Sequence, residues 1–224
     1  MRAAIALIAS LFLSSALAAP FALTVGETRL LLDTPPGYAD TTFTGSPRLQ
    51  ELAESLTSAS NRVLLFAISD ADLRRFTQGD PPEFRRHMLV ATPRAMERQR
   101  VDPDTFQRLA EDFLRGFRPP AEDTELAQYL DKQPVGTRSS LAQLRRDASV
   151  VTLLQGTRLE PTRIPRFFGT DERQNYLLST STLLVARGKV LNLAVFAVYE
   201  SPEDVAWIRA VTAAWVDQLQ RLNR

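Results

Sequence analysis

The segment that most constrains the fold is "VLNLAVFAVY", Val190 to Tyr199, near the C-terminus. It is apolar on both faces apart from Asn192, and a strand of this kind lies in the middle of its sheet with both faces covered. Residues 187–189 join it to the preceding "NYLLSTSTLLVA" and form the clearest β-hairpin in the chain. We therefore expect an α+β fold in which α-helices sandwich a mainly antiparallel β-sheet.

The N-terminal half contains further strands and two capped helices. Apolar runs that end at turn residues predict strands at Thr28–Asp33, Arg62–Ile68 and Arg86–Thr92. Ser46 followed by Pro47 is typical of a helix start, because serine caps the free backbone N–H groups and proline suits the first helical position. Ser69 and Asp72 have the spacing of a capping box, which predicts a short second helix.

The middle of the chain has a helical pattern. Asp102 and Pro103 begin an amphipathic segment that ends before Pro119. Two more helices are expected at roughly Glu122–Lys132 and Ser139–Arg146. We interpret about 103–147 as a helical insertion or crossover that packs against the sheet.

The β pattern returns from Ala148. "SVVTLLQGTRLE" predicts a strand with a bulge at Gly156, and "TRIPRFFGT" predicts an edge strand because Pro165 has no N–H to donate. In the last helix Ser201 is the expected N-cap and Asp204 completes a capping box, so this acidic stretch is interpreted as a helix start rather than an active site.

The N-terminus predicts export. Arg2 precedes an apolar run from Ala3 to Leu13, and small residues follow up to Ala18 and Ala19, as in a secretory signal peptide. The apolar run is shorter than the ~20 residues that cross a membrane. We expect a signal peptide at 1–19, a single domain at 20–224 with no membrane span after cleavage, and a periplasmic or secreted location.

The charge balance excludes some partners. Arg2 is the only charged residue of the leader, so the remaining chain has 26 cationic and 26 acidic side chains. A neutral chain lacks the positive surface that nucleic acid binding requires. The chain has no cysteine, which removes disulfides, thiol catalysis and soft-metal sites.

Two candidate catalytic or metal-binding features have simpler structural interpretations. His87 is the only histidine, no G-x-S-x-G occurs, and a zinc site would need further His or Cys ligands. We expect His87 to be a half-buried or edge residue. Asp102 and Asp104 resemble the start of a calcium loop, but the loop glycine is missing, so helix capping is the preferred role. The sequence therefore indicates no catalytic, cofactor-binding or metal-binding residue.

Arginine pairs and aromatic residues are the remaining candidates. The pairs Arg74-Arg75, Arg85-Arg86 and Arg145-Arg146 would hold an anion if the fold brought them together, but each has acidic neighbours, which favours a solvated surface. Four aromatic residues between the last hairpin and the last helix would line an apolar pocket, although core packing is the more common role: Tyr176, Phe196, Tyr199 and Trp207.

The two ends of the chain resemble a known fold. "RLLLDTPPGYAD" is similar to the first strand and turn of the PsbP-like α/β sandwich, and the last hairpin with "SPEDVAWIRAVTAAWVDQL" is similar to its last strands and closing helix. The same ends resemble a family of uncharacterised exported proteobacterial proteins. The resemblance implies a fold whose known members mostly bind other proteins or assist their assembly, and it implies no catalytic residue.

These observations favour an exported, non-enzymatic protein that binds a protein partner or a small ligand, with no cofactor. Two alternatives remain open. The first is a hydrolase that uses acidic residues, with or without His87. The second is an anion-binding module formed by the arginine pairs.

Overall fold

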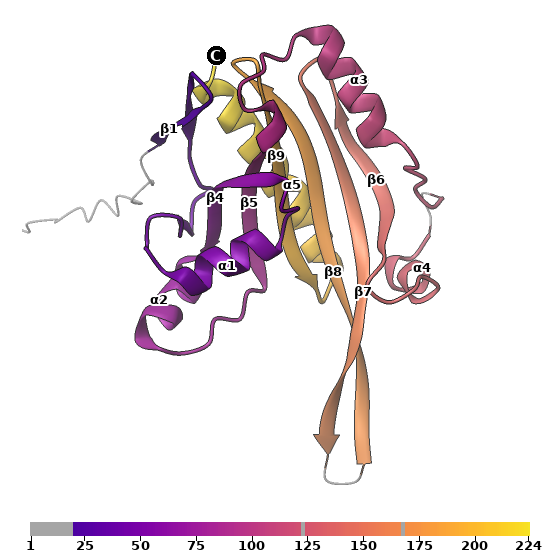
Figure 1. Ribbon diagram of the computed structural model, residues 1–224. Helices are drawn as coiled ribbons and strands as arrows, with labels where there is room; N and C mark the ends of the chain where they lie inside the picture. The colour runs from indigo at the N-terminus through magenta and orange to yellow at the C-terminus, as the bar shows by residue number, and fades with distance from the viewer. Residues whose placement is uncertain (1–19, 122–123, 167–168) are drawn as a thin grey trace, which may run out of the picture.

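A seven-stranded antiparallel sheet with the order β3-β4-β5-β9-β8-β7-β6 forms the centre of the molecule (Figure 1). The computed structural model describes residues 20–121, 124–166 and 169–224, and only the backbone from 162 to 174. The expected signal peptide at 1–19 lies outside the described residues. The strands are β3 (Tyr38–Asp40), β4 (Asn61–Ser69), β5 (Arg86–Pro93), β6 (Arg138–Arg146), β7 (Val150–Arg166), β8 (Gly169–Ala186) and β9 (Lys189–Tyr199).

A small hairpin and several helices surround this sheet. The hairpin consists of β1 (Phe21–Val25) and β2 (Thr28–Leu32). The described residues contain α1 (Pro47–Ser55), α2 (Asp70–Gln78), α3 (Pro103–Leu114), α4 (Leu126–Asp131), α5 (Pro202–Leu222) and the short 3-10 helix η1 (Arg94–Met96). The expected α+β class with a large antiparallel sheet is therefore confirmed.

Alternation along the strands assigns the helices to the two faces of the sheet. In β4, Leu65 and Ala67 join the core cluster that contains α5, whereas Phe66 and Ile68 join the cluster beneath α1 and α2. In β8, Leu184 belongs to the α5 cluster and Leu183 to a third cluster beneath α3. Neighbouring strand residues point to opposite faces, so α5 covers one face and α1, α2 and α3 cover the other.

The prediction for "VLNLAVFAVY" is confirmed. β9 is the fourth of seven strands, between β5 and β8. The hairpin closes at the Ala186↔Lys189 pair, and both turn residues have positive φ, 49° at Arg187 and 76° at Gly188. Both positive φ values match the tight hairpin turn that suits the twist of the strands.

The predicted starts of α1, α2 and α5 are also confirmed. Ser46 Oγ accepts the Leu49 N–H at 3.5 Å, and Ser69 Oγ accepts the Asp72 N–H at 3.0 Å. At α5, the backbone N–H of Ser201 donates to Asp204 Oδ2 at 3.1 Å. Buried residues on one side of α5 then pack on the sheet, as expected from the apolar stripe: Ile208, Trp215 and Leu219.

The third helix expected in the middle of the chain is wrong. Ser139–Arg146 lies within the edge strand β6, which pairs with β7 from Arg138↔Thr157 to Arg146↔Val151. The segment contains good helix formers, but its pairing with β7 outweighs that propensity. Only α3 and α4 of the expected 103–147 helical region are helices, and α4 begins at Leu126 rather than near Glu122.

The β7–β8 hairpin extends well beyond the sheet (Figure 1). Pairing of β6 with β7 ends at Thr157, and pairing of β9 with β8 begins at Tyr176. From Leu159↔Asn175 to Arg166↔Gly169 the two strands pair only with each other among the described residues. The edge strand expected around Pro165 is the outer part of this two-stranded ribbon, where β7 has no neighbour on its other side.

Candidate functional site

A groove with both apolar and polar lining lies between α4 and the first turns of α5, on the same face of the sheet as α5. Its volume is about 810 Å³, which is within the range of small-molecule and cofactor sites. Leu141 and Leu154 of β6 and β7 form its floor, together with Ala142. Gln143 of β6 also lines the cavity, and its walls are formed by α4 and the residues before it on one side and by the end of β9 and α5 on the other: Pro119, Pro120, Ala121, Thr124, Glu125, Leu126, Tyr129, Tyr199, Pro202, Val205 and Arg209. We name this cavity the α4–α5 groove.

The apolar side chains of the groove are continuous with the main core. Leu126, Leu141 and Val205 are only half-buried, yet they pack against the α5 core cluster. Groups of half-buried apolar side chains with a polar rim mark binding surfaces on soluble proteins. The α4–α5 groove is therefore a place where further burial of apolar surface would be favourable.

Polar side chains line the groove as well: Thr124, Glu125, Tyr129, Gln143, Tyr199 and Arg209. Glu125 accepts the backbone N–H groups of Ala127 at 3.1 Å and Gln128 at 2.8 Å, so its carboxylate caps α4. Burial, with a smaller contribution from the charge of Glu125, raises the pKa of the Tyr199 phenol. Tyr199 therefore remains a neutral hydrogen-bonding group at physiological pH.

The α4 wall is fixed to the base of the β7–β8 ribbon. Tyr176 Oη donates to Asp131 Oδ1 at 2.8 Å, and Arg158 Nη1 donates to the Asp131 carbonyl at 2.8 Å. Beneath it, the fully buried Leu130 packs on Gly156 so closely that a Cβ there would lie 2.9 Å from both Leu130 Cδ atoms. The bulge predicted at Gly156 is wrong: this residue pairs regularly with Ser139 and Leu178, and the missing side chain makes room for Leu130.

A second polar site connects α5 to the sheet. Arg86 Nη2 donates to Asp204 Oδ1 at 2.8 Å, and the guanidinium carbon of Arg86 lies 4.1 Å from the centre of the Trp207 ring. Asp204 Oδ2 also accepts the backbone N–H of Glu200 at 2.9 Å. Burial alone would raise the pKa of Asp204, but Arg86 and the backbone donors outweigh it and hold the pKa below its ordinary value.

The fold brings members of only two of the three arginine pairs together: Arg75, Arg85 and Arg86 line one cavity of about 340 Å³. Arg86 bonds Asp204 at the start of α5, whereas Arg145 bonds Asp217 at 2.7 Å thirteen residues further along the same helix, which is about 20 Å. Arg75 pairs with Glu83 at 2.7 Å. Arg85 pairs with Glu200. An anion site composed of all three pairs does not form.

His87 is neither half-buried nor at an edge, which corrects the prediction. It lies in the inner strand β5, is 8% exposed, and stacks on Phe196 with 4.7 Å between ring centres. Nδ1 lies 3.2 Å from the Phe84 carbonyl, and Nε2 has no hydrogen-bond partner among the described residues. Burial lowers the pKa of His87 to about 4, so the ring is neutral at physiological pH. The environment is that of a core aromatic residue.

The aromatic pocket considered as an alternative to core packing does not form as one unit, and Tyr176 and Phe196 are buried. Tyr176 and Tyr199 are in contact, with 6.1 Å between ring centres, and Tyr199 lines the α4–α5 groove. Phe196 instead stacks on His87, and Trp207 lies against Arg86 and Tyr38. Only Tyr199 of the four aromatic residues contributes to the groove.

The capping role predicted for Asp102 is confirmed. Its Oδ1 accepts the Thr105 N–H at 2.8 Å at the start of α3. Within the described part of the chain, no three His, Cys, Asp or Glu side chains are grouped so that they would hold a metal ion. No helix in that part has both the length and the apolar character that a membrane crossing requires.

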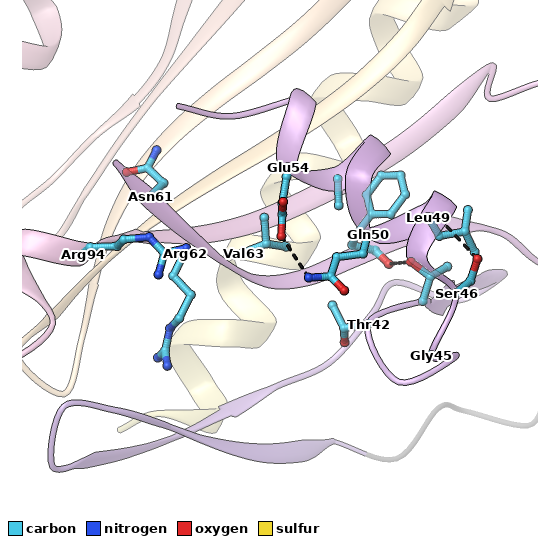
Figure 2. Close-up of a pocket in the computed structure, with 13 residues that line it drawn as sticks. Thr42, Gly45, Ser46, Leu49, Gln50, Glu54, Asn61, Arg62, Val63 and Arg94 are labelled. Atoms are coloured by element: carbon cyan, nitrogen blue, oxygen red, sulfur yellow. Dashed lines mark hydrogen bonds between the residues drawn. The ribbon is translucent and has the colours of Figure 1, made fainter. Parts of the chain in front are cut away.

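A cleft that no sequence pattern indicates lies between α1 and the start of β4, as Figure 2 shows. Arg62 and Arg94 lie at one end of it, near Asn61, and Gln50 and Glu54 project from α1. The two arginines are 32 positions apart, so neither appears as part of a charged pair in the sequence. The α4–α5 groove was missed for a similar reason, because its floor includes a strand that the sequence predicts as a helix.

Comparison with known proteins gives little further information. No protein-family model matches the chain, and no curated protein matches it. Among solved structures it is similar to the Ran-binding protein Mog1p of Saccharomyces cerevisiae, with 11% sequence identity and a TM-score of 0.33. The alignment covers 92% of this chain and 93% of Mog1p. Similarity at this level carries no argument about function.

Proposed function

We propose that this is an exported, non-enzymatic binding protein whose α4–α5 groove holds an apolar segment of a protein partner. One observation carries the proposal. A groove of about 810 Å³ has half-buried apolar side chains that are continuous with the core, and polar side chains such as Thr124, Gln143 and Arg209 line it as well. Protein interfaces likewise combine apolar and polar side chains.

A protein segment suits the groove better than a compact polar ligand. The floor offers Leu141 and Leu154, and the carboxylate of Glu125 is occupied by the α4 backbone. Burial of apolar side chains on this floor would supply the favourable free energy, at roughly 25 cal/mol per Å² before the costs of association. The α4 wall is held in place by the contacts of Asp131 and Leu130, so little ordering of that wall accompanies binding.

We also propose the periplasm or the exterior of the cell as the location, and a PsbP-like sandwich as the fold, with the region around 103–147 as an addition to it. The leader pattern at 1–19 and the two ends of the chain support these proposals. The protein recovered from a periplasmic extract should begin at Ala19 or Pro20 by N-terminal mass spectrometry. An intact Met1 in that protein would contradict export by signal cleavage.

The groove is tested by site-specific photo-cross-linking. Benzoylphenylalanine at Tyr129 or Val205, on the two walls, should yield the same cross-linked protein in the periplasmic fraction. Phe43 is the matched control, because it is 74% exposed and does not line the groove. Leu141→Glu should abolish the cross-link from both walls, since it places a charge on the apolar floor.

Two results would contradict the proposal. One is an equal yield of the same product from position 43. The other is an unchanged yield in the Leu141→Glu protein, provided that its circular dichroism matches that of the natural chain.

A further inference from the structure

The loop that begins with η1 concentrates positive charge on one side of the molecule. Arg94 and Arg98 are exposed there, and the ammonium group of Lys189 lies beneath them. Lys189 is 5% exposed, and its Nζ donates to the carbonyl groups of Glu97 and Gln99, both at 2.8 Å. No carboxylate is bonded to Lys189 among the described residues, so its charge adds to that of the arginines.

The loop is held close to the β1–β2 hairpin. A Cβ on Gly26 would lie 2.2 Å from the Glu97 carbonyl oxygen, so the two backbones approach as closely as a glycine permits. Arg62 spans the same contact, because its Nη2 donates to the Thr24 carbonyl at 2.8 Å. Lys189, Gly26 and Arg62 therefore fix the position of the loop relative to β4.

Two cavities meet at the arginines. The cleft beside α1 has a volume of about 360 Å³ and is drawn in Figure 2. A second cavity of about 500 Å³ lies between the loop and the β1–β2 hairpin, and its lining includes Arg98. Arg62 and Arg94 line both cavities. We name this joint site the arginine cleft.

The positive charge of the arginine cleft is only partly neutralised. Glu97 Oε1 lies 3.3 Å from the buried Nε of Arg62, but that Nε makes no hydrogen bond. The described residues provide no ion pair for Arg94 or for Arg98. Glu54 is the other carboxylate of the lining, and it accepts a hydrogen bond from Gln50 at 3.0 Å. Three guanidinium groups and a buried ammonium thus meet two carboxylates, although the chain after the leader has equal numbers of cationic and acidic side chains.

We propose that the arginine cleft binds a small ligand that carries a phosphate or carboxylate group. The guanidinium fork matches the oxygen spacing of both groups and forms paired, charge-assisted hydrogen bonds with them. Arg94 and Arg98 hold the oxyanion, and the fixed Arg62 closes the site from the β4 side. Asn61 lies beside Arg62 and offers a neutral amide to the rest of the ligand. The arginine cleft is separate from the α4–α5 groove and does not depend on its role.

Isothermal titration of the mature chain in low-salt buffer tests the proposal, with inorganic phosphate and citrate as separate probes. Tighter binding of one probe identifies the oxyanion class. The double variant Arg94→Gln/Arg98→Gln should weaken binding by about tenfold or more, since two charge-assisted contacts are lost. Glu54→Gln should strengthen binding of both probes, because the substitution removes a negative charge that repels an anion from the cleft.

Arg74→Gln is the matched control. Arg74 is exposed and lies on α2, beyond the opposite end of β4 from Arg62, which is about 23 Å along the strand. The affinity of the Arg74→Gln protein for both probes should equal that of the natural chain. The proposal is overturned if neither probe binds more tightly than about 10 mM. It is equally overturned if Arg74→Gln weakens binding as much as the double variant, or if the folded double variant binds as well as the natural chain.

Discussion

Two groups of arginines on the same sheet differ in what neutralises them. Near the start of α5, Arg75, Arg85 and Arg86 each have a carboxylate partner. At the arginine cleft, Arg94 and Arg98 have no carboxylate partner among the described residues. Arg62 lies near the carboxylate of Glu97, but the Nε atom that faces it makes no hydrogen bond. The first group connects secondary structure elements, whereas the second leaves its charge available to a ligand.

The difference shows why pairs of arginines in a sequence are poor guides to anion sites. Arg86 is paired by Asp204, which is 118 positions away, and not by an acidic neighbour. The arginines without an ion pair among the described residues, Arg94 and Arg98, both come from the segment after β5. Charge availability is therefore decided by the tertiary fold.

The largest effect on stability is expected for Asp204→Ala. The substitution leaves Arg86 without its carboxylate and removes the acceptor of the Glu200 and Ser201 N–H groups. Because the Arg86 side chain is 38% exposed, solvent screens part of the loss. We expect the free energy of unfolding in urea to fall by about 3 kcal/mol, the low end for a broken buried pair.

Glu203→Ala, on the exposed side of the same turn, is the control for Asp204→Ala and should change stability by under about 0.5 kcal/mol. The folded pKa of Asp204 is lowered. Its contribution is therefore present above the ordinary carboxylate pKa of about 4 and is lost as the pH falls further. A loss below about 1 kcal/mol at neutral pH would show that the pair is no stronger than a surface ion pair.

His87 gives a pH dependence in a different window. Its folded pKa of about 4 lies below the ordinary value of 6.5, so the unfolded chain takes up the proton first as the pH falls. Stability should decrease between pH 6.5 and pH 4, by about 3 kcal/mol in total from this residue. In the His87→Leu protein, the urea concentration at the midpoint of unfolding should depend less on pH across that window. An equally steep curve in the variant would mean that another group is responsible.

Lys189→Met tests the support of the arginine cleft. The carbonyl groups of Glu97 and Gln99 lose their shared donor, which should cost about 2 kcal/mol of unfolding free energy. Lys132→Met is the natural control, because Lys132 is the other lysine of the chain and is exposed. Equal melting temperatures for the two variants would contradict a structural role for Lys189.

The smallest effect is expected for Arg94→Ala. Since Arg94 is exposed and has no ion pair among the described residues, the change should alter the free energy of unfolding by under about 0.5 kcal/mol. Thermal unfolding without added anion measures this value. A clear destabilisation would place Arg94 with the structural arginines of the first group.

The features predicted well from the sequence are those with local causes. The caps at Ser46, Ser69 and Ser201 and the turn at 187–189 depend on neighbouring residues, and all occur as expected. The central position of β9 follows from its composition alone. By contrast, Ser139–Arg146 carries helix-forming residues, and only its pairing with β7 makes it a strand.

The two binding sites could not be predicted for the same reason. The α4–α5 groove is formed by segments from five parts of the chain, and its floor includes β6. The arginine cleft combines β4, the loop after β5 and the β1–β2 hairpin. The burial of His87 was predicted wrongly, because a single histidine in an apolar run does not show whether its strand lies at the edge or inside the sheet.

The ribbon at Leu159–Asn175 has a consequence for how this chain can be altered. In this ribbon the two strands pair with each other and, among the described residues, with no other strand of the sheet. Adding or removing matched pairs of residues there would therefore change only the length of the ribbon. An epitope or a fluorescent label could be grafted onto the ribbon without changing the strand pairs of the main sheet.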